Sequence, residues 1–140
     1  MATADASFES YLQSVIDRAA ERRCPPLLAS ALQYTVFPGG ARVRPTLCLA
    51  VAAANGNIDP VMAAAAAGAI ELLHCASLVH DDLPCFDNAR ERRGKPSVHV
   101  AFGERIAVLA GDTLIVTAFE SLALAAVRDR KSTRLNSSHT

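Results

Sequence analysis

The sequence lacks tryptophan and is poor in other aromatic residues, with five phenylalanines and two tyrosines among 140 residues. Aromatic and β-branched side chains favour strands, whereas alanine, which supplies 27 residues here, is the best helix former. These proportions argue against an all-β fold, and a hydrophobic fraction of 51% argues against a disordered chain. We therefore predict an all-α fold with a single core, since a chain of 140 residues is short for two.

The sequence has no excess charge of either sign, with 14 basic and 14 acidic residues, so we expect no nucleic-acid partner. It also lacks an apolar leader, and its four cysteines form no Cys-x-x-Cys pair. A cytoplasmic location with reduced thiols is the expectation. The longest apolar run, Val61 to Ile70, is too short to cross a bilayer, so we expect no membrane span.

Apolar periodicity and chain-breaking residues together predict five or six helices. The expected helical segments are residues 8–21, 27–37, 46–54, 60–80 and 106–127. The segment 60–80 is apolar nearly all round, which is typical of a central buried helix. Gly39 and Gly40 predict a flexible loop, and the charged stretch 84–97 predicts a polar loop.

The composition changes abruptly at Arg128, after which the chain is polar and aperiodic. We assign residues 1–128 to one domain and predict that residues 129–140 form a disordered tail. This tail also resembles the translated adapter sequence that is sometimes appended to unrelated proteins. A non-native origin therefore stays open, and the fold is argued without the tail.

Three aspartates close the long apolar helix: Asp81, Asp82 and Asp87. Buried carboxylates need a counter-charge, and the C-terminal end of a helix disfavours anions, so a bound cation would remove the conflict. Oxygen ligands at this density suit Mg²⁺, which shares its remaining positions with water and substrate phosphates. The alternative is a solvated helix end that binds nothing.

Basic residues surround this acidic cluster in the sequence. Four of them lie within residues 90–95, and Arg42 and Arg44 follow Gly39-Gly40 upstream. Because guanidinium groups match phosphate oxygens, they favour a diphosphate substrate that Mg²⁺ bridges to the carboxylates. The alternative is that the acidic and basic side chains simply pair with each other.

A single histidine shares a helix face with the acidic cluster. His74 lies seven residues before Asp81, about two helical turns, so both side chains project from one face. Taken alone, such a histidine is more often a satisfied core residue. Beside this cluster, a phosphate contact is the favoured interpretation.

Several ordered motifs resemble those of the all-helical polyprenyl diphosphate synthases. The first aspartate-rich motif of that family is similar to HDDLPCFDN over 80–88 together with RRGKPSVH over 92–99. Its diphosphate-binding loop is similar to GGARVRP over 39–45, and Gly103-Glu104 and the LAGD of 109–112 match as well. The resemblance runs from about residue 10 to residue 128, and it implies a helical bundle of the isoprenoid-synthase type.

The resemblance implies a prenyltransferase that condenses isopentenyl diphosphate with an allylic diphosphate such as the dimethylallyl, geranyl or farnesyl ester. Mg²⁺ on Asp81 and Asp87, supported by Asp82, would hold the allylic diphosphate, and Arg92 would stabilise it as it leaves. The implied substrate-binding residues are these: Gly40, Arg44, His74, Arg92, Arg93 and Lys95. The family is usually homodimeric, which makes a homodimer the expectation for a full-length protein.

Two departures from the family pattern stand out. The family usually has lysine at the position of Ala41, so one phosphate contact is missing. The family is also about twice as long and carries a second aspartate-rich motif, which makes this chain resemble the N-terminal half of an enzyme. We therefore expect little or no activity from the 140-residue chain itself, and an exposed apolar face that promotes self-association.

The residues just before the aspartate motif imply the product. In the family these positions form the floor of the pocket for the growing chain, and here they are the small residues Ala76 and Ser77. Together with the longer spacing between Asp82 and Asp87, they resemble the geranylgeranyl type, which makes a twenty-carbon product. Enlarging Ala76 to phenylalanine should then shorten the product, unless later helices set the limit.

Other functions stay open. A farnesyl diphosphate synthase is one alternative, and a fragment with half of the metal site could bind Mg²⁺–diphosphate without catalysis. Terpene cyclases and related Mg²⁺-dependent lyases have similar aspartate motifs but not the basic run of 92–96. A purely structural helical protein would leave the charge cluster unexplained.

Overall fold

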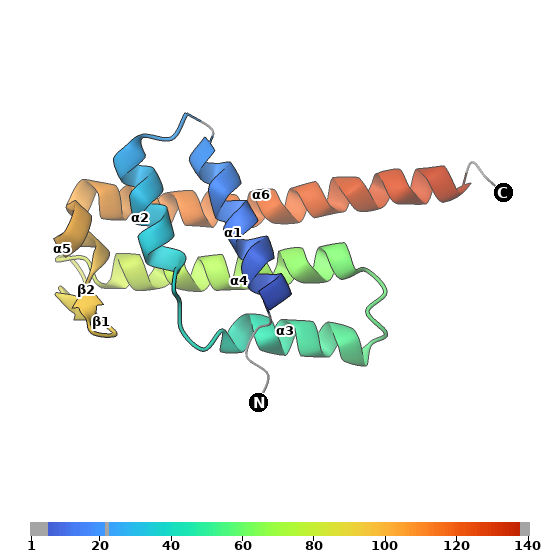
Figure 1. The fold of residues 1–140 in the computed structure, drawn as a ribbon, viewed down its shortest axis with the longest axis horizontal. Helices are drawn as coiled ribbons and strands as arrows, with labels where there is room; N and C mark the ends of the chain where they lie inside the picture. Colours follow the sequence, from blue (N-terminus) through green and yellow to red (C-terminus); the bar gives the residue numbers. More distant parts are fainter. Residues whose placement is uncertain (1–5, 22, 138–140) are drawn as a thin grey trace.

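The computed structural model describes residues 6–21 and 23–137, which form six helices and one short hairpin (Figure 1). The helices are α1 (Ala6–Glu21), α2 (Pro26–Val36), α3 (Val43–Ala54), α4 (Pro60–Asp81), α5 (Val98–Phe102) and α6 (Glu104–Ser137). The hairpin pairs β1 (Glu91–Arg92) with β2 (Lys95–Pro96) in antiparallel register, Glu91 opposite Pro96 and Arg92 opposite Lys95. The predicted all-α class is confirmed.

Helices α4 and α6 form the centre of the fold and run antiparallel, side by side (Figure 1). The helices α1 and α2 cross them, and α3 packs mainly on α4. The core between these elements is made of fully buried aliphatic side chains, the largest of which are Leu12, Ile16, Leu32, Leu72 and Leu114. The predicted central position of the long apolar helix is therefore confirmed.

Helix α4 begins where the sequence predicts it, for local chemical reasons. The Asp59 carboxylate accepts a hydrogen bond from the backbone N–H of Met62 at 3.0 Å, and Pro60 occupies the first helical turn. Gly68, in the middle of the helix, lies under the Tyr11 ring of α1, where a Cβ atom would approach the ring to 2.9 Å. The glycine thus permits close packing of α1 on α4.

Two expectations for the less regular segments are corrected. The stretch 84–97 is not wholly loop, because residues 91–96 close into the hairpin, and α5 follows it. Helix α6 passes through Gly111 and Asp112 without interruption. It also continues to Ser137, where disorder from residue 129 was expected, because no glycine or proline follows Gly111 in this segment and Arg130 and Lys131 are good helix formers. Residues 138–140 of the expected tail lie outside the described residues, and the domain boundary at 128 stays a prediction.

By length and composition alone, α4 and residues 104–131 of α6 could each cross a membrane. The same two helices make the most extensive helix–helix contact within the described part of the chain. Core helices of helical bundles share this apolar character, so composition does not separate the two possibilities. The expected lack of a membrane span therefore remains a prediction.

Large apolar side chains remain exposed on several helices, most of them on α3 and α6. On α6 they include Val116 and Phe119, and on α3 they include Val43 and Leu47. Exposed apolar patches of this kind usually mark surfaces that another segment or molecule covers. The expected exposed apolar face is therefore present, and the self-association predicted from it can be tested.

Candidate functional site

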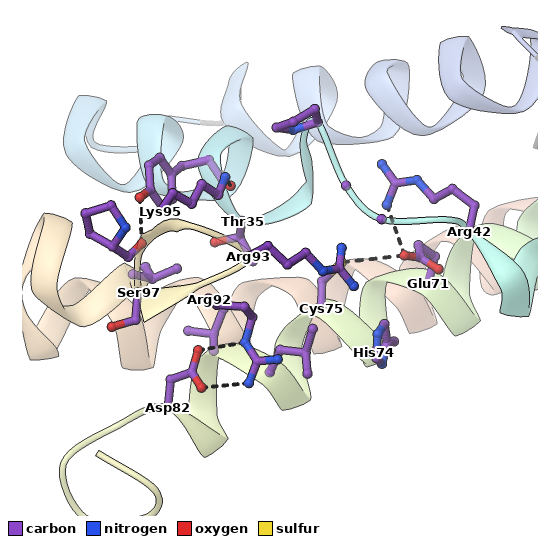
Figure 2. Close-up of a pocket in the computed structure, with 18 residues that line it drawn as sticks. Thr35, Arg42, Glu71, His74, Cys75, Asp82, Arg92, Arg93, Lys95 and Ser97 are labelled. Carbon is purple, nitrogen blue, oxygen red and sulfur yellow. Dashed lines mark hydrogen bonds and ion pairs between the residues drawn. The ribbon is translucent and has the colours of Figure 1, made fainter. Parts of the chain in front are cut away.

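A pocket of about 210 Å³ lies between α2, α4, the hairpin and the Gly39-Gly40 loop (Figure 2). Its walls include six of the residues that the sequence assigned to substrate or metal binding: Gly40, His74, Asp82, Arg92, Arg93 and Lys95. These residues come from the Gly39-Gly40 loop, from α4 with its end, and from the hairpin. Asp81, Asp87 and Arg44 do not line the pocket, although Arg44 contacts His74 on its wall.

Asp82 and Arg92 form a two-pronged ion pair on one side of the pocket (Figure 2). The Arg92 Nε and Nη2 atoms donate to the two carboxylate oxygens at 2.9 and 2.7 Å, and Asp82 is only 3% exposed. This hydrogen bond to Asp82 raises the pKa of Arg92 above its ordinary value. For these two residues, the acid–base pairing that the sequence left open is what the structure contains.

Asp81 and Asp87 are arranged differently from Asp82. The backbone N–H of Asp87 donates to the Asp81 carbonyl at 2.8 Å, which brings the two residues together at the end of α4. Both side chains are exposed, and within the described residues neither carboxylate has a hydrogen bond or ion pair. The chain thus presents two carboxylates rather than three for a cation.

Asp81 and Asp87 would supply only some of the ligands that a divalent cation needs. Within residues 6–21 and 23–137, no group of three or more His, Cys, Asp or Glu side chains is arranged to hold a metal. Mg²⁺ is often held by one or two carboxylates, with water and substrate phosphates completing its six positions. Asp81 and Asp87 match that ligand set, and Asp82, which Arg92 engages, does not add to it.

The Gly39-Gly40 loop is closely approached by two arginine side chains. A Cβ atom on Gly39 would clash with the guanidinium group of Arg42, and one on Gly40 would clash with that of Arg93. Gly39 also has a φ of +71°, which glycine adopts at little cost. Glycine is therefore needed at both positions, and the flexibility of the loop stays a prediction.

Arg42 packs against this loop and supports it, a role that was not predicted from the sequence. Its Nε donates to Glu9 at 2.7 Å, its Nη1 to Glu71 at 3.0 Å, and its Nη2 to the carbonyl of Val36 at 2.8 Å. Burial acts to lower the pKa of Arg42, but the hydrogen bonds with Glu9 and Glu71 outweigh it and raise this pKa. Arg42, which is 5% exposed, is therefore a structural cation and not a free phosphate ligand.

A signal for this network was present in the sequence. Glu71 is the only acidic residue of α4 before Asp81, and it lies among apolar residues. A carboxylate on a buried helix needs a cationic partner. The partner, Arg42, is 29 residues away along the chain, so the pair could not be assigned without the tertiary fold.

His74 and Arg44 form a second basic group at the pocket. The Arg44 Nη1 lies 3.3 Å from the His74 Nε2. Because a guanidinium group can only donate, the Nε2 atom must accept, and Nδ1 then carries the ring proton. Burial, and then the charge of Arg44, lower the pKa of His74, so the neutral ring is favoured near neutral pH.

Arg93 and Lys95 supply positive charge that no carboxylate among the described residues neutralises. The Lys95 Nζ donates to the carbonyls of Tyr34 and Phe37, at 2.8 and 3.4 Å, and lies 4.0 Å from the Tyr34 ring centroid. Burial, and then the charge of Arg93, lower the pKa of Lys95. A bound anion would relieve this repulsion, so the pocket is suited to a phosphate-bearing ligand.

The two residues expected to form the floor of a product pocket do not lie together. Ala76 is 1% exposed and belongs to the hydrophobic core. Ser77, the next residue of α4, is exposed, and its hydroxyl donates to the His74 carbonyl at 2.7 Å. Neither residue lines the pocket described above, so their effect on product length stays a prediction.

Comparison with known proteins gives consistent matches. A family model described as Polyprenyl synthetase matches residues 25–138. Geranylgeranyl diphosphate synthase from Rhodobacter capsulatus is 58% identical over 119 residues, which cover 85% of this chain and 41% of that protein. The enzyme of the same name from Cereibacter sphaeroides is 58% identical over 118 residues, covering 84% and 41%. The chain therefore spans about two fifths of the length of these curated relatives.

Solved structures agree with the sequence matches. An isoprenoid synthase family member from Thermotoga neapolitana has a TM-score of 0.75 at 44% identity, covering 86% of this chain and 46% of that one. A geranyltransferase from Legionella pneumophila has a TM-score of 0.76 at 42% identity, covering 86% and 41%. Both similarities extend over most of the helices described above.

Proposed function

Because the chain belongs to the polyprenyl synthetase family, we propose that it is the N-terminal part of a prenyltransferase of isoprenoid biosynthesis. The complete protein would condense isopentenyl diphosphate with an allylic diphosphate, and its product would be geranylgeranyl diphosphate, as the names of the two bacterial relatives suggest. The observation that carries this proposal is the pocket itself. Arg93 and Lys95 line it without carboxylate partners among the described residues, and Asp81 and Asp87, whose carboxylates also have no such partner there, adjoin the pocket residue Asp82 in the chain.

The side chains of the pocket suggest that different residues bind the two diphosphates. Arg93, Lys95 and the Arg44–His74 pair, next to Gly40, would bind isopentenyl diphosphate. Asp82 engages the Nε and Nη2 atoms of Arg92, and the Nη1 atom, which has no hydrogen bond among the described residues, would donate to the leaving diphosphate. Asp81 and Asp87 would hold Mg²⁺, which when bound supplies positive charge to the diphosphate oxygens.

The reaction that these groups would support breaks one bond and forms another. The allylic carbon–oxygen bond breaks, and its electron pair leaves with the diphosphate. The double bond of isopentenyl diphosphate then attacks the resulting carbocation, and loss of a proton gives a chain longer by five carbons. The apolar faces of α4 and α6 would exclude water from the cation.

A completed chain tests the proposal directly. Residues 1–128 would be joined to the remaining C-terminal part of the Rhodobacter capsulatus relative, and labelled isopentenyl diphosphate would be supplied with farnesyl diphosphate and Mg²⁺. We expect a labelled twenty-carbon diphosphate from the completed chain and little or none from the 140-residue chain. A completed chain that is folded and inactive would contradict the proposal. A fifteen-carbon product from geranyl diphosphate, without further extension, would favour a farnesyl diphosphate synthase.

For the complete protein we also propose a cytoplasmic homodimer without a membrane span. The exposed apolar side chains of α6 are consistent with a further interface. Light scattering during size-exclusion chromatography of the completed chain would give its mass, and twice the chain mass is expected.

Enlarging Ser77 should shorten the product of the completed chain. Ser77 lies four residues before Asp81 on the exposed face of α4, so a phenylalanine there can meet the growing hydrocarbon chain. We expect Ser77→Phe to move the main product from twenty to fifteen carbons, measured by chromatography of the hydrolysed products. Ala76→Phe is the matched comparison, because overpacking this buried position should cost about 1–3 kcal/mol of stability. An unchanged product in a folded Ser77→Phe protein would remove Ser77 from the determinants of length.

A further inference from the structure

His80 joins the end of α4 to α6 in a way that the proposed reaction does not use. Its Nε2 lies 3.2 Å from the carbonyl oxygen of Val108 and 3.5 Å from a carboxylate oxygen of Asp112. Because the carbonyl can only accept, Nε2 carries a proton and donates it. His80 therefore makes a contact across two helices.

Gly111 is the counterpart of His80 on α6. A Cβ atom at Gly111 would clash with the His80 ring, so no other residue permits this approach. Packing of the His80 ring thus favours glycine at position 111. The ring, the glycine and the Val108 carbonyl together fix the separation of α4 and α6 at this end.

The loop that carries Asp87 is attached to the residues directly after His80. The N–H groups of Asp87 and Ala89 donate to the carbonyls of Asp81 and Asp82, at 2.8 and 3.1 Å, and the N–H of Asn88 donates to Leu83 at 2.9 Å. A shift of the last turn of α4 would therefore move Asp81, Asp82 and the whole loop together. The position of both exposed carboxylates depends on where α6 holds His80.

We propose that His80, seated on Gly111 and bonded to the Val108 carbonyl, is a positioning residue that sets the location of Asp81 and Asp87. This inference rests on the proposed function only for its consequence, which is the affinity for Mg²⁺–diphosphate. The positioning itself is a property of the 140-residue chain. His80 acts through Asp81 and Asp87 and has no contact with substrate in this scheme.

Amide hydrogen exchange of the 140-residue chain tests the positioning without any activity. In His80→Phe, which keeps a ring but loses the donor, exchange at Asp87, Asn88 and Ala89 should accelerate about tenfold relative to the unchanged chain. His80→Gln, whose terminal amide can replace Nε2, should stay within about threefold. Thr113→Ala is the control, because within the described residues the Thr113 hydroxyl bonds to the Leu109 carbonyl of its own helix, at 2.7 Å, and to no other helix.

The outcomes separate a local effect from general destabilisation. Acceleration in the loop without change in α1 supports the proposal, and equal rates in His80→Phe and Thr113→Ala overturn it. If His80→Phe loosens all helices together, the comparison of His80→Gln with the shorter His80→Asn decides instead. Faster loop exchange in His80→Asn alone supports positioning, and equal exchange in both rejects it.

A second measurement links the positioning to the ligand. In the completed chain, calorimetric titration with Mg²⁺ and inorganic diphosphate should show about tenfold weaker binding for His80→Phe than for His80→Gln. Equal affinities would overturn the link to the carboxylates. If the unchanged completed chain makes no prenyl product, the proposed function fails, while the exchange result still decides the positioning.

Discussion

Replacing Arg42 by methionine is expected to lower the free energy of unfolding by about 3–5 kcal/mol, enough to leave much of the protein unfolded. Arg42 and Glu71 are both nearly inaccessible to solvent, with side chains 3% and 6% exposed. Without the guanidinium group, Glu71 would keep the thiol of Cys75, at 4.0 Å, as its one hydrogen-bond partner among the described residues. An uncompensated carboxylate inside the fold is the origin of the large cost.

Urea unfolding followed by circular dichroism would measure this loss in the 140-residue chain. Arg44→Met is the matched control, because Arg44 is exposed and its change should cost less than about 0.5 kcal/mol. The double variant Arg42→Met, Glu71→Met removes both charges and should regain part of the lost stability. A single Arg42→Met variant as stable as the unchanged chain would show that the network does not support the fold.

The helices could be predicted because their causes are local. Proline at the first turn of α2 and α4, the Asp59 cap and the alanine-rich composition all act within a few residues. The apolar character of α4 on nearly every side also predicts its central position. The end of α6 was misjudged because a polar composition does not prevent a helix that contains no breaker.

The partners of the charged residues could not be predicted, because they depend on distant segments. The sequence places Arg42 beside the diphosphate loop, where it looks like a phosphate ligand. The fold pairs it with Glu9 and Glu71, 33 and 29 residues away. From the sequence alone, Gly39 and Gly40 likewise predict a backbone with conformational freedom. In the structure, an arginine side chain occupies the space next to each glycine.

The three aspartates of a single motif show the same limit on predicting side-chain partners from sequence. Sequence chemistry treats Asp81, Asp82 and Asp87 as equivalent oxygen ligands. In the fold, Asp82 turns inward to Arg92, and the other two remain at the surface without partners among the described residues. Neighbouring positions at the end of a helix point in different directions, so adjacent carboxylates acquire different tasks.

Asp81→Asn should therefore lower mainly the activity, and Asp82→Asn should lower the stability. In the completed chain, Asp81→Asn should lower kcat by about 10²–10³-fold, the scale for loss of one group that stabilises developing charge. It should leave the unfolding free energy within about 0.5 kcal/mol, because the Asp81 side chain is exposed.

Asp82→Asn should instead destabilise the protein by about 1–3 kcal/mol, since it weakens a charge-assisted pair whose arginine side chain is 38% exposed. Its effect on kcat should be accompanied by loss of hairpin order, because Arg92 lies in β1 and depends on Asp82 for its position. Urea unfolding and steady-state kinetics on both variants measure the two effects separately. Equal stability losses for the two substitutions would mean that Asp81 is also structural, and the two-carboxylate assignment would then be wrong.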